Sequence, residues 1–385
     1  MIEFAEPEMG KVRVKVVGVG NAGGNIVRRI SRERLPGVEC GAINTAIKDL
    51  GNCPEVRSLQ IGGGLTHGHG AGMDPAVGRK AALEDATKIR DFIGQCDVLF
   101  LAAGFGKGTG TGATPAIAEM ALAAGTLTVA LVTTPFSFEK RRHHEVAEEG
   151  LEEIRDRVDA FVPLSNQRLF SMPAMAAVED AFAYMDEAIL QAVRGIVDVL
   201  IRGGRMSLDL ADMRTLLKGA GQAAVAVGSG KGETRVADIL KGLKEYPFLD
   251  DGRLGRPRDL LVSLIGGRDL LSKEIEEITA SVAEMADGDP KMTLGMHIDE
   301  TMQGEIRAMV LAAGQVQPSA PATQDFDLFG DAMLRGVPGL YRPAQFSKGR
   351  GPGAEREQVP AGKDDSEYPS YLRKGKGLQF PGARG

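Results

Sequence analysis

The stretch Gly104-Phe105-Gly106-Lys107-Gly108-Thr109-Gly110-Thr111-Gly112 decides the fold, because of what stands on either side of it. Before it, residues 97–103 (DVLFLAA) form an apolar run typical of a strand buried in a parallel sheet. After it, PAIAEMALAAG has the pattern of a helix, with Pro115 suited to its first turn. A strand, a glycine loop and a helix in this order predict one unit of an α/β fold.

The same order occurs near the N-terminus. A β-branched run at 12–19 ends in the glycine turn 18–25 (GVGNAGGN), and the helical pattern IVRRISRERL follows directly. Further strands are predicted at 38–44 and 127–133. Alternating strands and helices with short connections predict a doubly wound, mostly parallel sheet.

The second half of the chain has a different organisation. A long helical pattern runs from Ala176 to Arg202, apolar on more than one face like a spine between domains, and Gly203-Gly204 ends it. Strands at 222–227, 260–265, 292–298 and 306–312, with a helix at 273–286, predict a smaller α+β domain. We therefore divide the chain into an N-terminal domain (1–175), a central helix (176–203), an α+β domain (204–315) and a tail (316–385). The tail is rich in Pro, Gly, Gln, Lys and Asp, which predicts a flexible, disordered segment.

Composition excludes several classes of protein. The chain has 385 residues, of which 43% are hydrophobic and 25% charged, with a net charge of -6. That charge gives no pull toward nucleic acid or acidic lipid. Cys40, Cys53 and Cys96 follow no metal or disulfide spacing, and no signal peptide or membrane-spanning run is present. The sequence predicts a cytoplasmic protein without direct membrane insertion.

Glycine loops between a strand and a helix suit the binding of phosphate. Their backbone N–H groups can approach an anion closely, and the helix dipole favours negative charge. The first loop alone fits a dinucleotide site or a plain turn equally well. The second adds the hydroxyls of Thr109 and Thr111, and both loops would face one phosphate chain across the sheet edge. No GxxxxGK[ST] pattern is present, which disfavours a P-loop enzyme. Two alternatives remain: a pair of structural turns, or a dinucleotide-dependent oxidoreductase with Glu39 as the ribose-binding acid.

Two histidine pairs and one acidic pair have simpler explanations. His67 and His69 lie in a third glycine-rich loop, and no further ligand is paired with them by spacing, which favours solvated histidines over a metal site. His143-His144 lie in a charged helix, EKRRHHEVAEE, and the same holds for them. Asp209 and Asp212 come just before a helix, where they can act as an N-cap and acidic first turn or polarise a water near a phosphate. Chemistry alone favours the first of these.

A resemblance to a family changes that balance. GFGKGTGTGATP resembles the tubulin signature loop and is most similar to its version in the FtsZ family. VGVGNAGGNIV, GAINTA, LTHGHGAGMDPAVGRKAALED and VTTPFSFE resemble further nucleotide loops of that family, and SLDLADMRTLL resembles the segment that enters the partner subunit's site. KEYPFLDD, LLVSLIGG and LGMHIDETMQGEIR continue the match, which covers roughly residues 10 to 315. The tail patch YPSYLRK (368–374) resembles the peptide by which such proteins bind membrane tethers and division regulators.

The resemblance implies specific roles. Glu139 would contact the ribose, Asn166 and Asp186 would read the guanine edge, and Phe182 would pack against the base. Asp209 and Asp212 would complete the GTPase site of the next subunit, so hydrolysis would depend on polymerisation. The full set of expected GTP/GDP-binding residues is Gly20, Asn21, Ala22, Gly24, Asn25, Asn44, Ala71, Gly72, Gly106, Lys107, Gly108, Thr109, Gly110, Thr133, Pro135, Glu139, Arg142, His143, Asn166, Phe182 and Asp186.

Four positions depart from the family pattern: Lys107 for a glycine, His143 for an arginine, Ser207 for an asparagine and Ala46 for an aspartate. We expect a protein that binds GTP with Mg²⁺, forms head-to-tail protofilaments and hydrolyses GTP at the subunit interface, at the division septum. Because of the departures, a divergent relative with weak or no hydrolysis, forming static or regulatory filaments, remains the alternative.

Overall fold

The computed structural model describes residues 12–51, 56–170, 178–201 and 206–314. All of them belong to one compact unit, residues 1–322. The predicted tail with its 368–374 peptide, the first residues of the predicted long helix and Gly203-Gly204 lie outside the described residues.

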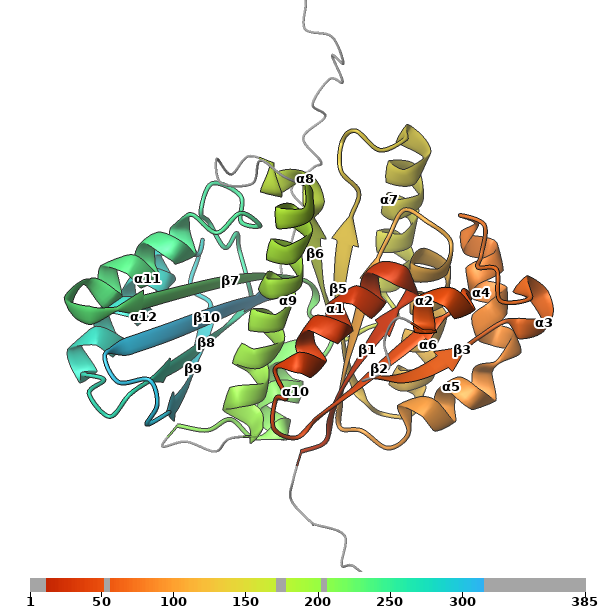
Figure 1. Cartoon of the computed structure of the whole chain (residues 1–385). Helices are drawn as coiled ribbons and strands as arrows, with labels where there is room; N and C mark the ends of the chain where they lie inside the picture. Colours follow the sequence, from red (N-terminus) through yellow and green to blue (C-terminus); the bar gives the residue numbers. More distant parts are fainter. Residues whose placement is uncertain (1–11, 52–55, 171–177, 202–205, 315–385) are drawn as a thin grey trace, which may run out of the picture. The chain divides into compact units, whose positions relative to one another are not determined.

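The described strands form one sheet in the order β3-β2-β1-β4-β5-β6-β7-β10-β8-β9 (Figure 1). Their bounds are β1 Val14–Val19, β2 Val38–Asn44, β3 Arg57–Gln60, β4 Val98–Gly104, β5 Leu127–Thr134, β6 Ala160–Ser165, β7 Gly221–Lys231, β8 Asp259–Gly266, β9 Lys291–Ile298 and β10 Glu305–Ala313. Strands β3 to β7 pair in parallel, whereas β10 pairs antiparallel with both β7 and β8. The order from β3 to β6 is that of a doubly wound nucleotide-binding sheet, which confirms the predicted fold class.

Helices cover both faces of this sheet. Their bounds are α1 Gly20–Arg32, α2 Ile47–Gly51, α3 Gly63–Thr66, α4 Pro75–Glu84, α5 Ala86–Ile93, α6 Thr109–Ala123, α7 Arg141–Arg155, α8 Asn166–Leu169, α9 Val178–Ile201, α10 Leu210–Leu217, α11 Arg235–Lys244 and α12 Ser272–Met285, with a 3₁₀ turn at Gly232–Thr234. Alternate residues of β1 join different cores: Val14 and Val16 pack with α1 and α9, and Val17 and Val19 pack with α5 and α6. This alternation shows why an unbroken apolar run forms a strand buried on both faces.

The long helix α9 packs between helix α1 and the strands β7 to β10. It contacts α1 on one side and strands β7 to β10 on the other, and Met185, Ile189, Val193 and Ile196 along it are almost fully buried. Its burial on several sides agrees with the predicted spine. The division of the chain at residues 175, 203 and 315 stays a prediction.

Two details of the sequence prediction were wrong. Helix α6 begins at Thr109, so Pro115 lies inside the helix and not in its first turn. The helix starts inside the glycine loop because the carbonyl of Gly108 already accepts a helical hydrogen bond from the Gly112 amide, at 3.0 Å. Gly106 N also donates to Thr111 Oγ1 at 2.9 Å, which joins the loop to the first turn of the helix. The third glycine loop is also not entirely irregular, since the short helix α3 precedes its histidines.

Candidate nucleotide site

A cavity of about 950 Å³ lies where the strand order reverses between β1 and β4. In open α/β sheets this switch point, outside the carboxyl ends of the strands, is where ligands bind. The expected residues that line the cavity are Gly20, Asn21, Ala22, Asn25, Asn44, Ala71, Lys107, Gly108, Thr109, Gly110, Thr133, Pro135, Glu139, Asn166, Phe182 and Asp186. Segments from β1 to α9 therefore meet around one space.

Two helices open into this cavity with no side-chain cap. Helix α1 follows Val19 and helix α6 follows Gly108, and neither residue caps its helix with a side chain. Helices α5, α7 and α11 also begin without a side-chain cap, so the distinguishing feature of α1 and α6 is that both begin at this cavity. The first N–H groups of a helix need acceptors, and its N-terminus carries a partial positive charge. Two uncapped N-termini at one cavity therefore form a site for an anion.

The glycine loops lie close enough to exclude side chains. A Cβ on Gly110 would lie 2.3 Å from the carbonyl oxygen of Gly104, and one on Gly108 would lie 2.7 Å from the Cβ of Ala71. Gly20 has a φ of +74° and faces Gly110 across the gap between the two loops. The three loops can approach one another only because these positions carry no side chain.

Two polar groups at the other end of the cavity can accept hydrogen bonds from a ligand. Asn166 is buried, and its Oδ1 has no hydrogen-bond partner among the described residues. Asp186 is half-buried, and burial raises the pKa of its carboxyl group to about 6 against the opposing effect of Arg29 and Arg28. A buried acceptor without a donor is rare in proteins, so the Oδ1 of Asn166, with the carboxylate of Asp186 beside the same cavity, fits a ligand that presents N–H groups, as the edge of guanine does.

The ring of Phe182 completes this end. It remains 50% exposed while packing edge-on against Phe136, with 5.3 Å between ring centroids. Phe136 itself is buried and also packs against Phe138 and Phe170. The exposed face of Phe182 offers a flat apolar surface of the kind on which a base packs.

Glu139 is held by contacts that the sequence did not predict. Its Oε1 accepts a hydrogen bond from the Phe136 amide at 3.2 Å. Its Oε2 lies 3.1 Å from Nδ1 of His143 and 3.8 Å from Nζ of Lys107. Two of the residues that depart from the family pattern thus converge on one carboxylate oxygen.

Five expected residues do not line the cavity: Gly24, Gly72, Gly106, Arg142 and His143. Gly106 packs instead against Pro135 and the carbonyl of His143, where a Cβ would lie 2.6 Å from Pro135 Cγ and 2.8 Å from that carbonyl oxygen. His143 reaches the cavity only through Glu139.

Other lining residues were missed from the sequence. Arg28, Arg29 and Arg32 of α1 and Lys48 of α2 line the same cavity. The available signal was the four-residue spacing of Arg28 and Arg32, which places both on one face of a helix that begins at a glycine loop. Thr45 was also missed; its hydroxyl lies 2.7 Å from that of Thr109 and joins the loop after β2 to the start of α6.

Asp209 and Asp212 do not line the cavity and cap helix α10. Asp209 accepts a hydrogen bond from the Asp212 amide at 2.7 Å, and Asp212 Oδ2 accepts one from the Asp209 amide at 3.3 Å. This reciprocal arrangement is a capping box. Both residues are exposed, so their carboxylates are accessible to another molecule.

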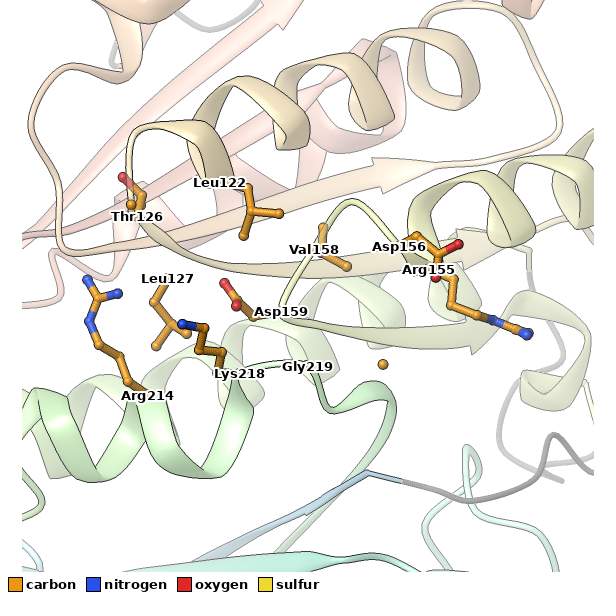
Figure 2. A pocket seen from close by; sticks show the side chains of 12 residues that line it. Leu122, Thr126, Leu127, Arg155, Asp156, Val158, Asp159, Arg214, Lys218 and Gly219 are labelled. Carbon is orange, nitrogen blue, oxygen red and sulfur yellow. The ribbon is translucent and has the colours of Figure 1, made fainter.

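A second cavity, of about 550 Å³, is lined by the cationic Arg155, Arg214 and Lys218 and by the acidic Asp156 and Asp159 (Figure 2). It lies at the C-terminal ends of α6, α7 and α10, which carry partial negative charge. Arg155 and Arg214 stand in the last turns of α7 and α10, where a cation offsets that charge. The helix dipoles therefore favour an anion in the first cavity and not in the second.

The described residues contain neither a metal cluster nor a membrane-spanning helix. No group of at least three His, Cys, Asp or Glu side chains is arranged to hold a metal ion there. Among the same residues, no helix combines the length and the apolar character needed to cross a membrane.

Comparisons with known proteins show the family of the chain. Residues 13–173 match the model of the tubulin/FtsZ family GTPase domain, and residues 221–316 match that of the FtsZ family C-terminal domain. The chain is 37% identical over 329 residues to cell division protein FtsZ 2 of Rhizobium meliloti, covering 83% of this chain and 95% of the relative. It is 33% identical to cell division protein FtsZ of Azotobacter vinelandii, covering 97% of this chain and 91% of the relative. The solved structure of an empty FtsZ dimer from M. jannaschii matches with a TM-score of 0.73 at 32% identity, over 80% of this chain and 89% of that one.

Proposed function

The chain belongs to the tubulin/FtsZ family of cell-division cytoskeletal GTPases, and from this premise we propose that it binds GTP in the switch-point cavity and polymerises head to tail. The observation that carries the proposal is the meeting of two uncapped helix N-termini at one cavity. Backbone amides of α1 and α6 would hold the phosphates, as the helix dipoles favour.

The opposite end of the cavity would select the base. Asp186 and the free Oδ1 of Asn166 accept hydrogen bonds, and guanine presents N1–H and an N2 amino group at one edge. Adenine has no donor at N1, so it would leave these acceptors unpaired, which is costly inside a protein. Glu139 would accept from a ribose hydroxyl, and Phe182 would cover the face of the base.

Hydrolysis would require a second subunit. Asp209 and Asp212 are exposed on α10 and do not line their own cavity. Entering the neighbour's cavity, they would orient a water toward the terminal phosphate. Mg²⁺ in such sites is usually held by phosphate oxygens, water and one or two carboxylates, so a dedicated cluster of protein ligands is not required.

One assay tests both binding and assembly. Phosphate release from GTP, measured across protein concentration, should show a threshold below which turnover is absent, because each active site needs two subunits. Sedimentation with GTP, GDP and no nucleotide should give pelleting that depends on GTP. Turnover strictly proportional to protein concentration would contradict the shared site, and absence of guanine-nucleotide binding by calorimetry would contradict the whole proposal.

A second candidate is a relative that assembles without fast hydrolysis. It is favoured by Ala46, which lines the cavity where the family pattern has a carboxylate, and by the pairing of Lys107 with Glu139. GTP-dependent pelleting without phosphate release would support this candidate against the first.

The place of action also remains a proposal. Residues 368–374, outside the described part of the chain, would bind a membrane tether or a division regulator and bring the polymer to the division septum. Deleting them should leave sedimentation unchanged and abolish localisation at mid-cell. Normal localisation of the deletion variant would exclude this role for the peptide.

A further inference from the structure

The side chain of Lys107 provides a charge in a loop that otherwise offers only backbone amides and hydroxyls. Lys107 directly precedes Gly108, the N-cap residue of α6, and it lines the cavity beside Gly108, Thr109 and Gly110. Its side chain is 62% exposed. A phosphate bound at the N-terminus of α6 would therefore lie within the reach of its flexible four-carbon stem.

The ion pair that Lys107 forms with Glu139 is weak. The distance of 3.8 Å from its Nζ to Glu139 Oε2 exceeds the 2.7–2.9 Å that is typical of a charge-assisted hydrogen bond. Glu139 has two closer partners, His143 Nδ1 at 3.1 Å and the Phe136 amide at 3.2 Å. Loss of Lys107 would leave this carboxylate positioned by both of them, so releasing the lysine costs little.

Resting on the proposed GTP site, we propose that Lys107 is a phosphate-binding residue that pairs with Glu139 in the empty cavity and transfers to the nucleotide's phosphates on binding. A diphosphate carries more negative charge than one carboxylate, so the transfer is electrostatically favoured. It also removes a cation from Glu139 Oε2, which then has room for a ribose hydroxyl. The lysine thereby couples the phosphate end of the site to the ribose end.

The test is the ratio of the dissociation constants of guanosine and GDP, which isolates the contribution of the phosphates. Lys107→Met keeps the length of the side chain and removes its charge, and Lys107→Arg keeps the charge. We expect the ratio to fall about tenfold in the Met variant, the usual effect of one hydrogen bond to a charged group, and to be largely retained in the Arg variant. In Glu139→Gln, where the lysine has no carboxylate to leave, the ratio should equal or exceed that of the unmodified chain.

Lys140→Met is the matched control. Lys140 is exposed, lies one residue after Glu139 and does not line the cavity, so its variant carries the same change of charge without the proposed contact. Equal ratios in Lys107→Met and the unmodified chain would overturn the inference, and so would an equal fall in both Met variants. If the unmodified chain binds neither guanosine nor GDP, the proposed function fails first; if it binds both and the ratio ignores Lys107, only this inference fails.

Discussion

Replacing Asp186 by asparagine tests how the site recognises its base. Burial raises the pKa of this carboxyl group from 3.8 to about 6. Only the ionised form accepts both guanine donors. At pH 5, one unit below the pKa, roughly one molecule in eleven is ionised, so the affinity for GDP should be about tenfold lower than at pH 8. In Asp186→Asn the pH dependence that comes from this residue should disappear.

The raised pKa of Asp186 also predicts that the stability of the protein falls as pH rises, whereas its affinity for GDP increases. A carboxyl group whose pKa is higher in the folded state favours folding when protonated, so its contribution is fully present below 3.8 and is lost as pH rises through about 6. The difference of about two units corresponds to about 3 kcal/mol. Asparagine carries no charge but still loses hydration, so we expect Asp186→Asn to stabilise the nucleotide-free protein by about 2 kcal/mol at pH 8 and by nothing at pH 4.

Two measurements check these expectations. Titration with a fluorescent GDP analogue at several pH values compares both proteins, and because the phosphates of the ligand titrate identically in each, the comparison cancels their effect. Urea unfolding without nucleotide gives the two stabilities. Asparagine can also donate to the second carbonyl of xanthine, so xanthosine diphosphate should bind the variant better than the unmodified chain. A variant that shows the same pH profile as the unmodified chain, or that is less stable at pH 8, would refute this account of Asp186.

Four further substitutions have defined outcomes. Gly23→Ala should destabilise the fold by more than about 2 kcal/mol in thermal unfolding, since its Cβ would lie 2.2 Å from the Ala102 carbonyl oxygen. Gly24→Ala, whose Cβ would have nothing within 4 Å, should be neutral or stabilising by up to about 1 kcal/mol. Equal effects of the two substitutions on stability would contradict the described packing. Asp209→Asn should keep the N-cap of α10 and its melting temperature yet lose GTP turnover, and unchanged turnover would remove Asp209 from the proposed shared site. Phe182→Ala should weaken GDP binding with little loss of stability because this ring is 50% exposed, and unaltered affinity in calorimetry would exclude base packing there.

The fold could be predicted well where the local sequence carries clear strand signals. The second strand has the predicted bounds, Val38–Asn44, because β-branched residues and flanking turns mark it clearly. Strand β6 and helix α11 were not predicted. The apolar run in β6 is short and contains Pro163, and α11 alternates charged and apolar residues without a clear start signal. The secondary structure of such segments is determined by tertiary packing and not by local sequence.

The site could be predicted only in part. The glycine loops are recognisable because consecutive residues determine both their backbone conformation and their ability to bind phosphate. Lys107 and Glu139 are 32 residues apart in the sequence, so no local sequence pattern predicts that they form an ion pair. The raised pKa of Asp186 depends on burial by several elements, so it too required the assembled structure.

The cavity between the glycine loops and α9 has a consequence for synthesis of the chain. Along the chain, Gly20 is the first residue that lines the cavity and Asp186 is the last. All residues up to Asp186 must therefore be translated before the cavity can form. At ordinary elongation rates the interval is roughly ten to thirty seconds. A ribosome-bound chain that ends before α9 carries every glycine loop and still lacks Phe182 and Asp186. Nucleotide can therefore act as a folding partner only late, when the emerging α9 closes the cavity.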